Sequence, residues 1–88
     1  MTAKRVARIN DTISHGGEII EGSPTVSTNS RKVARLGDQV QCDVHGLQTI
    51  TSASLTVKAN GRGVARLGDS ISCGATITSA SSNVLAGG

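Results

Sequence analysis

The chain repeats itself three times, and this repetition constrains the fold more than any other feature. Three segments share the order Val-Ala-Arg-(Ile/Leu)-(Asn/Gly)-Asp and align without gaps: Val6–His15, Val33–Cys42 and Val64–Cys73. Each segment is followed by an Ile and a Val seven residues apart, at Ile19 and Val26, Ile50 and Val57, and Ile77 and Val84. The 88 residues therefore predict one domain, 1–88, made of three copies of one unit, at about 6–26, 33–57 and 64–84.

The spacing between the copies has one irregularity. The first two copies begin 27 residues apart, and the second and third begin 31 residues apart. The extra residues fall between Cys42 and Ile50, which are eight residues apart, whereas the equivalent pairs in the other copies are four apart. A single insertion of about residues 43–46 accounts for the difference, and it brings His45 into the second copy.

The composition shows that a core of ordinary size is absent. The chain has no Phe, Trp or Tyr, and its 7 Ile, 5 Leu and 8 Val are outnumbered by 11 Gly, 11 Ser and 9 Thr. Even a well-built core of this size supplies only about 3–5 kcal/mol, so small domains usually add a disulfide, a metal or a partner. The net charge of +3 is too small, and the share of Leu, Ile and Val too large, for a chain that is simply disordered.

The local pattern predicts an all-β fold. Short runs rich in Val, Ile and Thr alternate with turn residues. Asn29-Ser30 and Asn60-Gly61 each lie between the end of one copy and the start of the next, and Asn-Gly is the strongest two-residue hairpin signal. The third hairpin has no return strand, because the sequence stops at Gly87-Gly88. We therefore expect the strand around Val6 to pair with the C-terminal strand and to close a pseudo-three-fold ring without open sheet edges.

This arrangement would bring four ligand side chains together. His15, Cys42 and Cys73 occupy the same position of the three copies, so they should approach one axis, and His45 of the insertion is free to join them. They are the only two His and the only two Cys of the chain. Two thiolates and two imidazoles favour Zn²⁺ among the common divalent ions. The sequence predicts one Zn²⁺ per chain, bound by His15, Cys42, His45 and Cys73.

Two other interpretations of these residues remain open. Cys42 and Cys73 could form a disulfide, which would leave the placement of both His unexplained. The four residues could also be unrelated, since the Cys42-x-x-His45 spacing alone arises by chance. Because four protein ligands leave no open position for water, the zinc site is expected to be structural, and its binding energy would supply folding energy. Glycines beside the ligands, at Gly16, Gly17, Gly46 and Gly74, would let the backbone crowd close to the metal.

Each copy also carries an Arg and an Asp three residues apart, at Arg8 and Asp11, Arg35 and Asp38, and Arg66 and Asp69. One interpretation is a ring of charges that grips a ligand. We favour the other, in which Asp serves a turn and the Arg stem covers apolar surface. The Ser and Thr residues between the copies' landmarks are expected to be solvent-facing strand positions. With no free His or acid to activate them, they offer no nucleophile, and no enzymatic activity is expected.

Several classes of protein are disfavoured. No apolar run is long enough to span a membrane, and no apolar segment follows Met1–Arg5 as a classical signal peptide requires. A zinc-finger nucleic-acid binder would share the Cys/His set and the positive charge. It would also need a recognition helix, stacking aromatics or a Lys/Arg cluster, and the sequence has none of these. We expect no nucleic-acid partner.

From Val6 to about Val84 the chain resembles PAAR-repeat proteins. The resemblance rests on the three x-Ala-Arg-(Leu/Ile)-(Gly/Asn)-Asp blocks, on the stretch from His15 to Val26, and on Cys42-x-x-His45-Gly46. Where the family has Pro-Ala-Ala-Arg, this chain has Val in place of the second residue and no Pro in any copy, as in Arg5-Val6-Ala7-Arg8. The resemblance implies a small cone of β-hairpins with the metal near its tip.

The resemblance also implies a function. PAAR cones cap the trimeric spike of contractile injection machines, which is the valine-glycine-repeat protein (VgrG) in type VI secretion and the central baseplate spike in contractile phage tails. We expect one chain per VgrG-like trimer, transient contact with a target membrane, and assembly in the cytoplasm followed by delivery out of the cell. A phage baseplate tip is the alternative. No effector domain is expected within the chain, so any effector cargo would attach non-covalently or to the spike.

Overall fold

A computed structural model describes residues 4–82 and 84–86, and these residues form nine short strands and no helix. None of the described segments is a helix that could cross a membrane. The signal-peptide prediction at Met1–Arg5 and the chain end at Gly87-Gly88 lie partly or wholly outside the described residues. The strands are β1 (Lys4–Arg5), β2 (Gly17–Ile19), β3 (Ser27–Thr28), β4 (Arg31–Lys32), β5 (Gln39–Cys42), β6 (Gly46–Thr49), β7 (Lys58–Ala59), β8 (Arg62–Gly63) and β9 (Leu85–Ala86).

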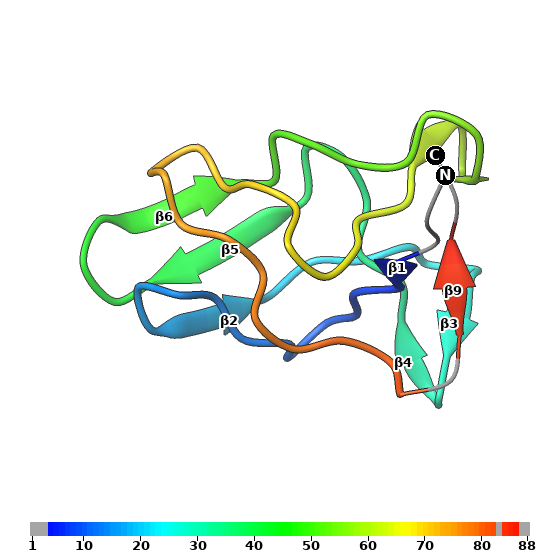
Figure 1. The fold of residues 1–88 in the computed structure, drawn as a ribbon, viewed down its shortest axis with the longest axis horizontal. Coiled ribbons are helices and arrows are strands. Elements are labelled where there is room, and N and C mark those ends of the chain that lie inside the picture. The colour runs from blue at the N-terminus through cyan, green and yellow to red at the C-terminus, as the bar shows by residue number, and fades with distance from the viewer. Residues whose placement is uncertain (1–3, 83, 87–88) are drawn as a thin grey trace.

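The strands form four small antiparallel sheets, which confirms the all-β prediction. The largest sheet has the order β2-β5-β6 and occupies one end of the molecule, at the left of Figure 1. The pairs β1-β9 and β3-β4 lie at the opposite end, at the right of Figure 1. The fourth pair is β7-β8. The principal extents of 30 × 27 × 23 Å describe a small body with two distinct ends.

Two of the hairpins have the turns that the sequence predicts. Asn29 and Ser30 connect β3 to β4 with φ angles of 53° and 65°, and Asn60 and Gly61 connect β7 to β8 with φ angles of 54° and 78°. Two successive positive φ angles define the type I′ turn, whose twist matches that of the flanking strands. Both predicted hairpins are therefore confirmed, including the one whose turn ends in Ser rather than Gly.

The chain ends close the structure as predicted. β1 pairs antiparallel with β9, so that Lys4 lies opposite Ala86 and Arg5 opposite Leu85. This pair takes the place that a third hairpin would occupy. It leaves the N-terminal and C-terminal strands paired with each other rather than exposed as open edges.

The three motif alanines meet at the centre in a ring of hydrogen bonds. The backbone N–H of Ala7 donates to the carbonyl of Ala65 at 2.9 Å, Ala65 donates to Ala34 at 2.9 Å, and Ala34 donates to Ala7 at 3.0 Å. All three side chains are fully buried. Because three backbones converge here, only a small side chain fits beside each of them. The ring explains why Ala, rather than a larger apolar residue, stands at this position of every copy.

The buried apolar side chains form two clusters on either side of this convergence. The first runs toward the β2-β5-β6 end and contains the alanines, Cys42 and the isoleucines of the repeats. The second lies toward the β1-β9 end and consists of Val6, Val33, Ala59, Val64 and Ala86. Equivalent residues of the three copies thus make equivalent contacts, while the pseudo-three-fold axis and the repeat boundaries stay predictions.

Candidate metal centre

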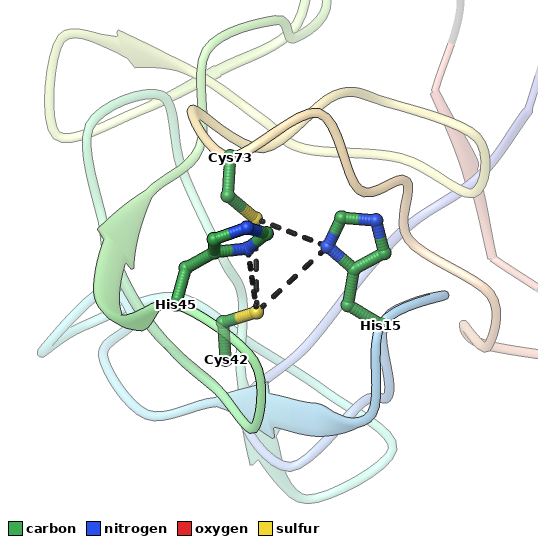
Figure 2. A group of neighbouring side chains, drawn as sticks. All are labelled: His15, Cys42, His45 and Cys73. Carbon is green, nitrogen blue, oxygen red and sulfur yellow. Dashed lines mark hydrogen bonds between the residues drawn. The ribbon is translucent and has the colours of Figure 1, made fainter.

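The four predicted ligands come from three turns and one strand end. His15 lies in the turn before β2, Cys42 is the last residue of β5, His45 lies in the turn between β5 and β6, and Cys73 lies in the turn after Ile71. Their side chains point toward one another (Figure 2). One ligand atom from each residue lies within 4.8 Å of the other three. The structure therefore brings together all four residues that the sequence singles out, near one end of the molecule.

The inserted residues explain how the fourth ligand arrives. They extend β5 and β6 into the longest hairpin of the chain, with Cys42 opposite Gly46. The tight turn between these two residues carries His45 toward the sulfur of Cys42. The other two copies lack the inserted residues, so the equivalent turn is shorter and supplies one ligand, His15 in the first copy and Cys73 in the third.

Four of the six separations between donor atoms are close to those of a tetrahedral zinc site. The two sulfur atoms, of Cys42 and Cys73, are 3.7 Å apart. The Cys42 sulfur lies 3.9 Å from Nδ1 of His15 and 3.7 Å from Nδ1 of His45, and the Cys73 sulfur lies 3.6 Å from Nδ1 of His15. Zn–S bonds of about 2.3 Å and Zn–N bonds of about 2.0–2.1 Å place two sulfur donors of a regular tetrahedron about 3.8 Å apart, and a sulfur and a nitrogen donor about 3.6 Å apart. The four measured separations fall at or close to these values.

The disulfide interpretation does not describe this structure. Both thiols are free, and their sulfur atoms are 3.7 Å apart, whereas a disulfide bond is about 2.05 Å long. The rings of His15 and His45 lie beside the two sulfurs, with centroids 5.2 Å apart and a tilt of 48° between their planes. A donor set of two nitrogens and two sulfurs fits Zn²⁺, while the geometry by itself names no metal.

The environment of Cys42 favours the thiolate, which is the form that binds metals. Burial opposes the charge on Cys42, but the backbone N–H groups of His45 and Val44 and the side chains of His45 and Cys73 outweigh it. Together they lower the pKa of Cys42 from 9.0 to about 6. The lowered pKa of Cys42 favours the thiolate form that a metal would bind.

The glycines beside the ligands act differently from the prediction. Gly46 and Gly74 have φ angles of 77° and 92°, but a Cβ atom at either would meet nothing within 4 Å. They are needed for left-handed backbone, not for crowding. Only the first copy is crowded, because a Cβ at Gly17 would lie 1.9 Å from the carbonyl oxygen of Gln41 on β5.

The Arg–Asp pairs are structural, as favoured, but they are buried rather than spread over the surface. In each copy the Asp N–H donates to the Arg carbonyl at 3.0 Å and so closes a turn. In the second copy, Asp38 accepts hydrogen bonds from the backbone N–H, Nε and Nη2 of Arg35, each at 2.8 Å. This contact raises the pKa of Arg35 against the opposing effect of burial. The same three contacts recur between Arg8 and Asp11 and between Arg66 and Asp69.

The expectation that the intervening serines face solvent is wrong at three positions. Ser23, Ser54 and Ser81 are buried. The hydroxyl of Ser23 accepts hydrogen bonds from the N–H groups of Thr25 and Val26, at 3.2 and 2.9 Å, and donates to the side-chain oxygen of Asn60. The same oxygen accepts from Nη1 of Arg35 at 3.3 Å. A buried network thus joins a hairpin turn of one copy to the Arg–Asp pair of another.

One sequence signal could have separated these three serines from the exposed ones: each lies three residues before the landmark Val of its copy, and no other serine position recurs in all three copies. Ser81 repeats the arrangement with Asn29, whose side-chain oxygen accepts from Arg8 at 3.2 Å. No buried side-chain nitrogen or oxygen in the described part of the chain lacks a hydrogen-bond partner. The polar side chains of the described interior are therefore satisfied by hydrogen bonds.

Comparison with known proteins identifies one relationship. A family model described as PAAR motif matches residues 9–79 of the 88 residues. That range contains all four candidate ligands, two complete Arg–Asp pairs and Asp11 of the third. No curated protein matches the chain.

Proposed function

Because the chain belongs to the PAAR-motif family, whose members are associated with the spike tips of contractile injection systems, we propose that it is a metal-stabilised spike tip. In this role one chain caps the blunt end of a trimeric VgrG-like spike and helps the spike to pierce a target membrane. The family is structural rather than enzymatic. The observation that carries the proposal is the contrast between the two ends: four metal ligands converge at one, and a ring of exposed valines lies at the other.

The metal end supports the role of a rigid point. His15, Cys42, His45 and Cys73 would hold one Zn²⁺ per chain as a closed structural site. The ion would contribute folding energy by joining residues of all three copies at this end. Val44 and Leu47 flank His45 and are both exposed, so the same loop presents apolar side chains at the tip.

The opposite end supports docking to a trimer. Val26, Val57 and Val84 occupy equivalent positions of the copies and are exposed to nearly the same extent, at 40, 39 and 38%. They surround a shallow depression of about 180 Å³ whose other lining residues include Val6, Val33 and Val64. A single chain that presents three equivalent apolar edges suits a partner with three identical subunits. Without large aromatic anchors, the affinity would come from shape and from many small contacts.

The setting follows from the role. The chain would join the spike in the cytoplasm and leave the cell with it. Any effector would ride on the spike or bind non-covalently to the tip.

Two measurements test the proposal. Native mass spectrometry of the purified chain, without added metal, should find a monomer with one zinc ion and two reduced thiols. Mixing the chain with a trimeric VgrG-like spike from the same organism should give a complex of one chain per trimer. Val57→Asp, at the exposed ring, should abolish this complex, whereas Thr56→Asp, its exposed neighbour, should preserve it. A homotrimer of the chain, or a spike complex that survives Val57→Asp, would contradict the proposed capping.

A further inference from the structure

One flank of the molecule has an open groove that lies apart from the metal centre and shares only Lys58 with the depression inside the valine ring. Its volume is about 480 Å³, within the range of about 300–1,000 Å³ that ligand sites occupy. It is lined by residues 51–55, by Leu36, and by the β7-β8 hairpin with Lys58, Arg62 and Gly63. The groove therefore lies between the loop that ends the second repeat and the hairpin that leads into the third.

The groove depends on a residue that differs among the copies. Gly63 aligns with Lys32 and Arg5, so it is the only one of the three without a side chain. The structure requires glycine here, because a Cβ at this position would lie 2.3 Å from the carbonyl oxygen of Ser54. On the flank of the first copy the relation is reversed: Lys32 carries the side chain, and a Cβ at Gly22 would lie 2.9 Å from its Cβ. The flank with Gly63 thus differs from the flank of the first copy in which of the two facing residues carries a side chain.

The groove has an apolar edge that the fold does not use. Leu55 is 82% exposed and Leu36 is 41% exposed. The residues that align with Leu55 are Pro24 and Ser82, so only this flank presents a leucine there. A single exposed leucine on a surface is common, but two beside one concave site make an apolar contact surface.

The charges around the groove all have one sign. Lys58 and Arg62 are its only ionisable lining residues. Arg62 is held in place, since its Nη1 lies 3.5 Å from a carboxylate oxygen of Asp38 and 3.4 Å from the carbonyl oxygen of Leu36. Among the described residues no ion pair is recorded for Lys58, whose charge therefore remains available beside the leucines.

We infer that this groove docks a peptide segment of a partner protein in which leucine-like side chains alternate with carboxylates. The apolar side chain would lie against Leu36 and Leu55, and a carboxylate would face Lys58. A second copy of this chain suits the groove less, because each copy carries a net charge of +3. The inference goes beyond the proposed spike role, and it explains how a chain of three similar copies would bind one partner molecule rather than three.

The test is a nuclear magnetic resonance titration of the full, zinc-loaded chain with two blocked synthetic peptides. One peptide alternates Glu and Leu, and the other alternates Lys and Leu. The acidic peptide should shift the amide signals of residues 51–55 and 58–63 with a Kd of about 1 mM or below and should leave the signals of the four metal ligands in place. The basic peptide should bind at least about tenfold more weakly, because it brings like charge to Lys58.

Two variants assign the site. Leu55→Ser and Lys58→Glu each change a surface side chain, and each should weaken the acidic peptide about tenfold or more. Val44→Ser removes a comparably exposed apolar side chain near the metal and should change nothing. Equal binding of both peptides, shifts centred on Val26, Val57 and Val84, or no shift up to several times 1 mM would overturn the inference. Concentration-dependent dimerisation lost in Leu55→Ser would overturn it too, because the occupant would then be a second copy.

The outcome is separable from the spike role. Val26→Asp, at the valine ring but outside the groove, should abolish spike capping while peptide binding persists, and Leu55→Ser should do the reverse. Failure of one proposal therefore leaves the other standing.

Discussion

The metal centre and the Arg–Asp network both join the three copies, but they do so by opposite means. At the metal centre the equivalent positions hold His15, Cys42 and Cys73, and an insertion adds His45, so the copies differ where they meet. Their donor atoms face one another across long contacts of 3.6–3.9 Å that involve sulfur. In the network the copies are nearly identical, and every described buried polar side-chain atom is satisfied within the chain.

The difference teaches where this small domain obtains its stability. The network and the alanine ring consist of hydrogen bonds between groups of the protein, so their contribution to stability requires no ion. The four donors of the metal centre would contribute to stability by binding an ion. Variants that remove parts of each region in turn test how much each region contributes to stability.

The largest effect should follow from removing the metal or one of its thiolates. Cys42→Ser, or a strong chelator, should abolish stoichiometric zinc and lower the melting temperature by tens of degrees, because structural zinc binding contributes about 10–16 kcal/mol in small peptides. Circular dichroism melting and metal analysis measure both. Val44→Ser, in the same loop, should keep zinc and stability. Equal melting temperatures with and without chelator would show that the network alone sustains the fold.

The next largest effect should follow from breaking one buried ion pair. Asp38→Asn leaves Arg35 buried without its carboxylate and should cost about 3–5 kcal/mol in the free energy of unfolding. Urea unfolding of the zinc-loaded chain measures the loss. Glu18→Gln, an exposed acid on β2, is the matched control and should cost little. Equal losses in the two variants would contradict the separation of the two regions.

A smaller effect should follow from filling the alanine ring. Ala34→Val adds two methyl groups where three backbones converge and should cost about 1–3 kcal/mol. Thr56→Val, on the surface, should change stability little. The measurement is again urea unfolding, and a neutral Ala34→Val would mean that the centre has unused space.

A buried serine should matter still less. Ser23→Ala removes the hydroxyl that caps Thr25 and Val26 and bonds Asn60, and should cost about 1–2 kcal/mol. Ser27→Ala, exposed on β3, should be neutral within about 0.5 kcal/mol. If both variants were neutral, the network would end at the Arg–Asp pairs.

The smallest effect on stability should come from the exposed valine ring. Val57→Ser should change the free energy of unfolding by less than about 0.5 kcal/mol and yet weaken binding to a trimeric spike. Calorimetric titration with the spike measures the second effect. A large loss of stability in Val57→Ser would assign this valine to the core instead of the docking surface.

The sequence predicted the elements whose physics is local or repeated. Asn29-Ser30 and Asn60-Gly61 predict their turns because the positive φ angles are properties of those residues. The convergence of His15, Cys42 and Cys73 follows from the alignment of the copies, and His45 follows from the position of the insertion. The pairing of β1 with β9 follows from counting strands that lack partners.

The sequence did not predict which polar side chains are buried or which segments meet around the groove. Ser23 has the same side chain as the exposed Ser27, and only the folded structure shows that its hydroxyl lies under a turn of another copy. The burial of Arg35 was missed for the same reason, because an Arg beside an Asp is compatible with surface and interior alike. The groove beside Gly63 was missed because its walls come from segments that meet only in three dimensions.

The alanine ring has a consequence for how the chain folds. Its hydrogen bonds join residues that are far apart in the sequence, Ala7 with Ala65 above all, and the strand pair that closes the structure joins Lys4 to Ala86. Contacts of such high sequence separation are slow to form, because the entropy lost in closing the intervening loop comes before any stabilisation from the contact. In an open array of repeats one unit can fold and its neighbours can add to it, whereas here the pairing of the first and last strands requires nearly the whole chain. We therefore expect folding to be a single cooperative step on the millisecond-to-second scale.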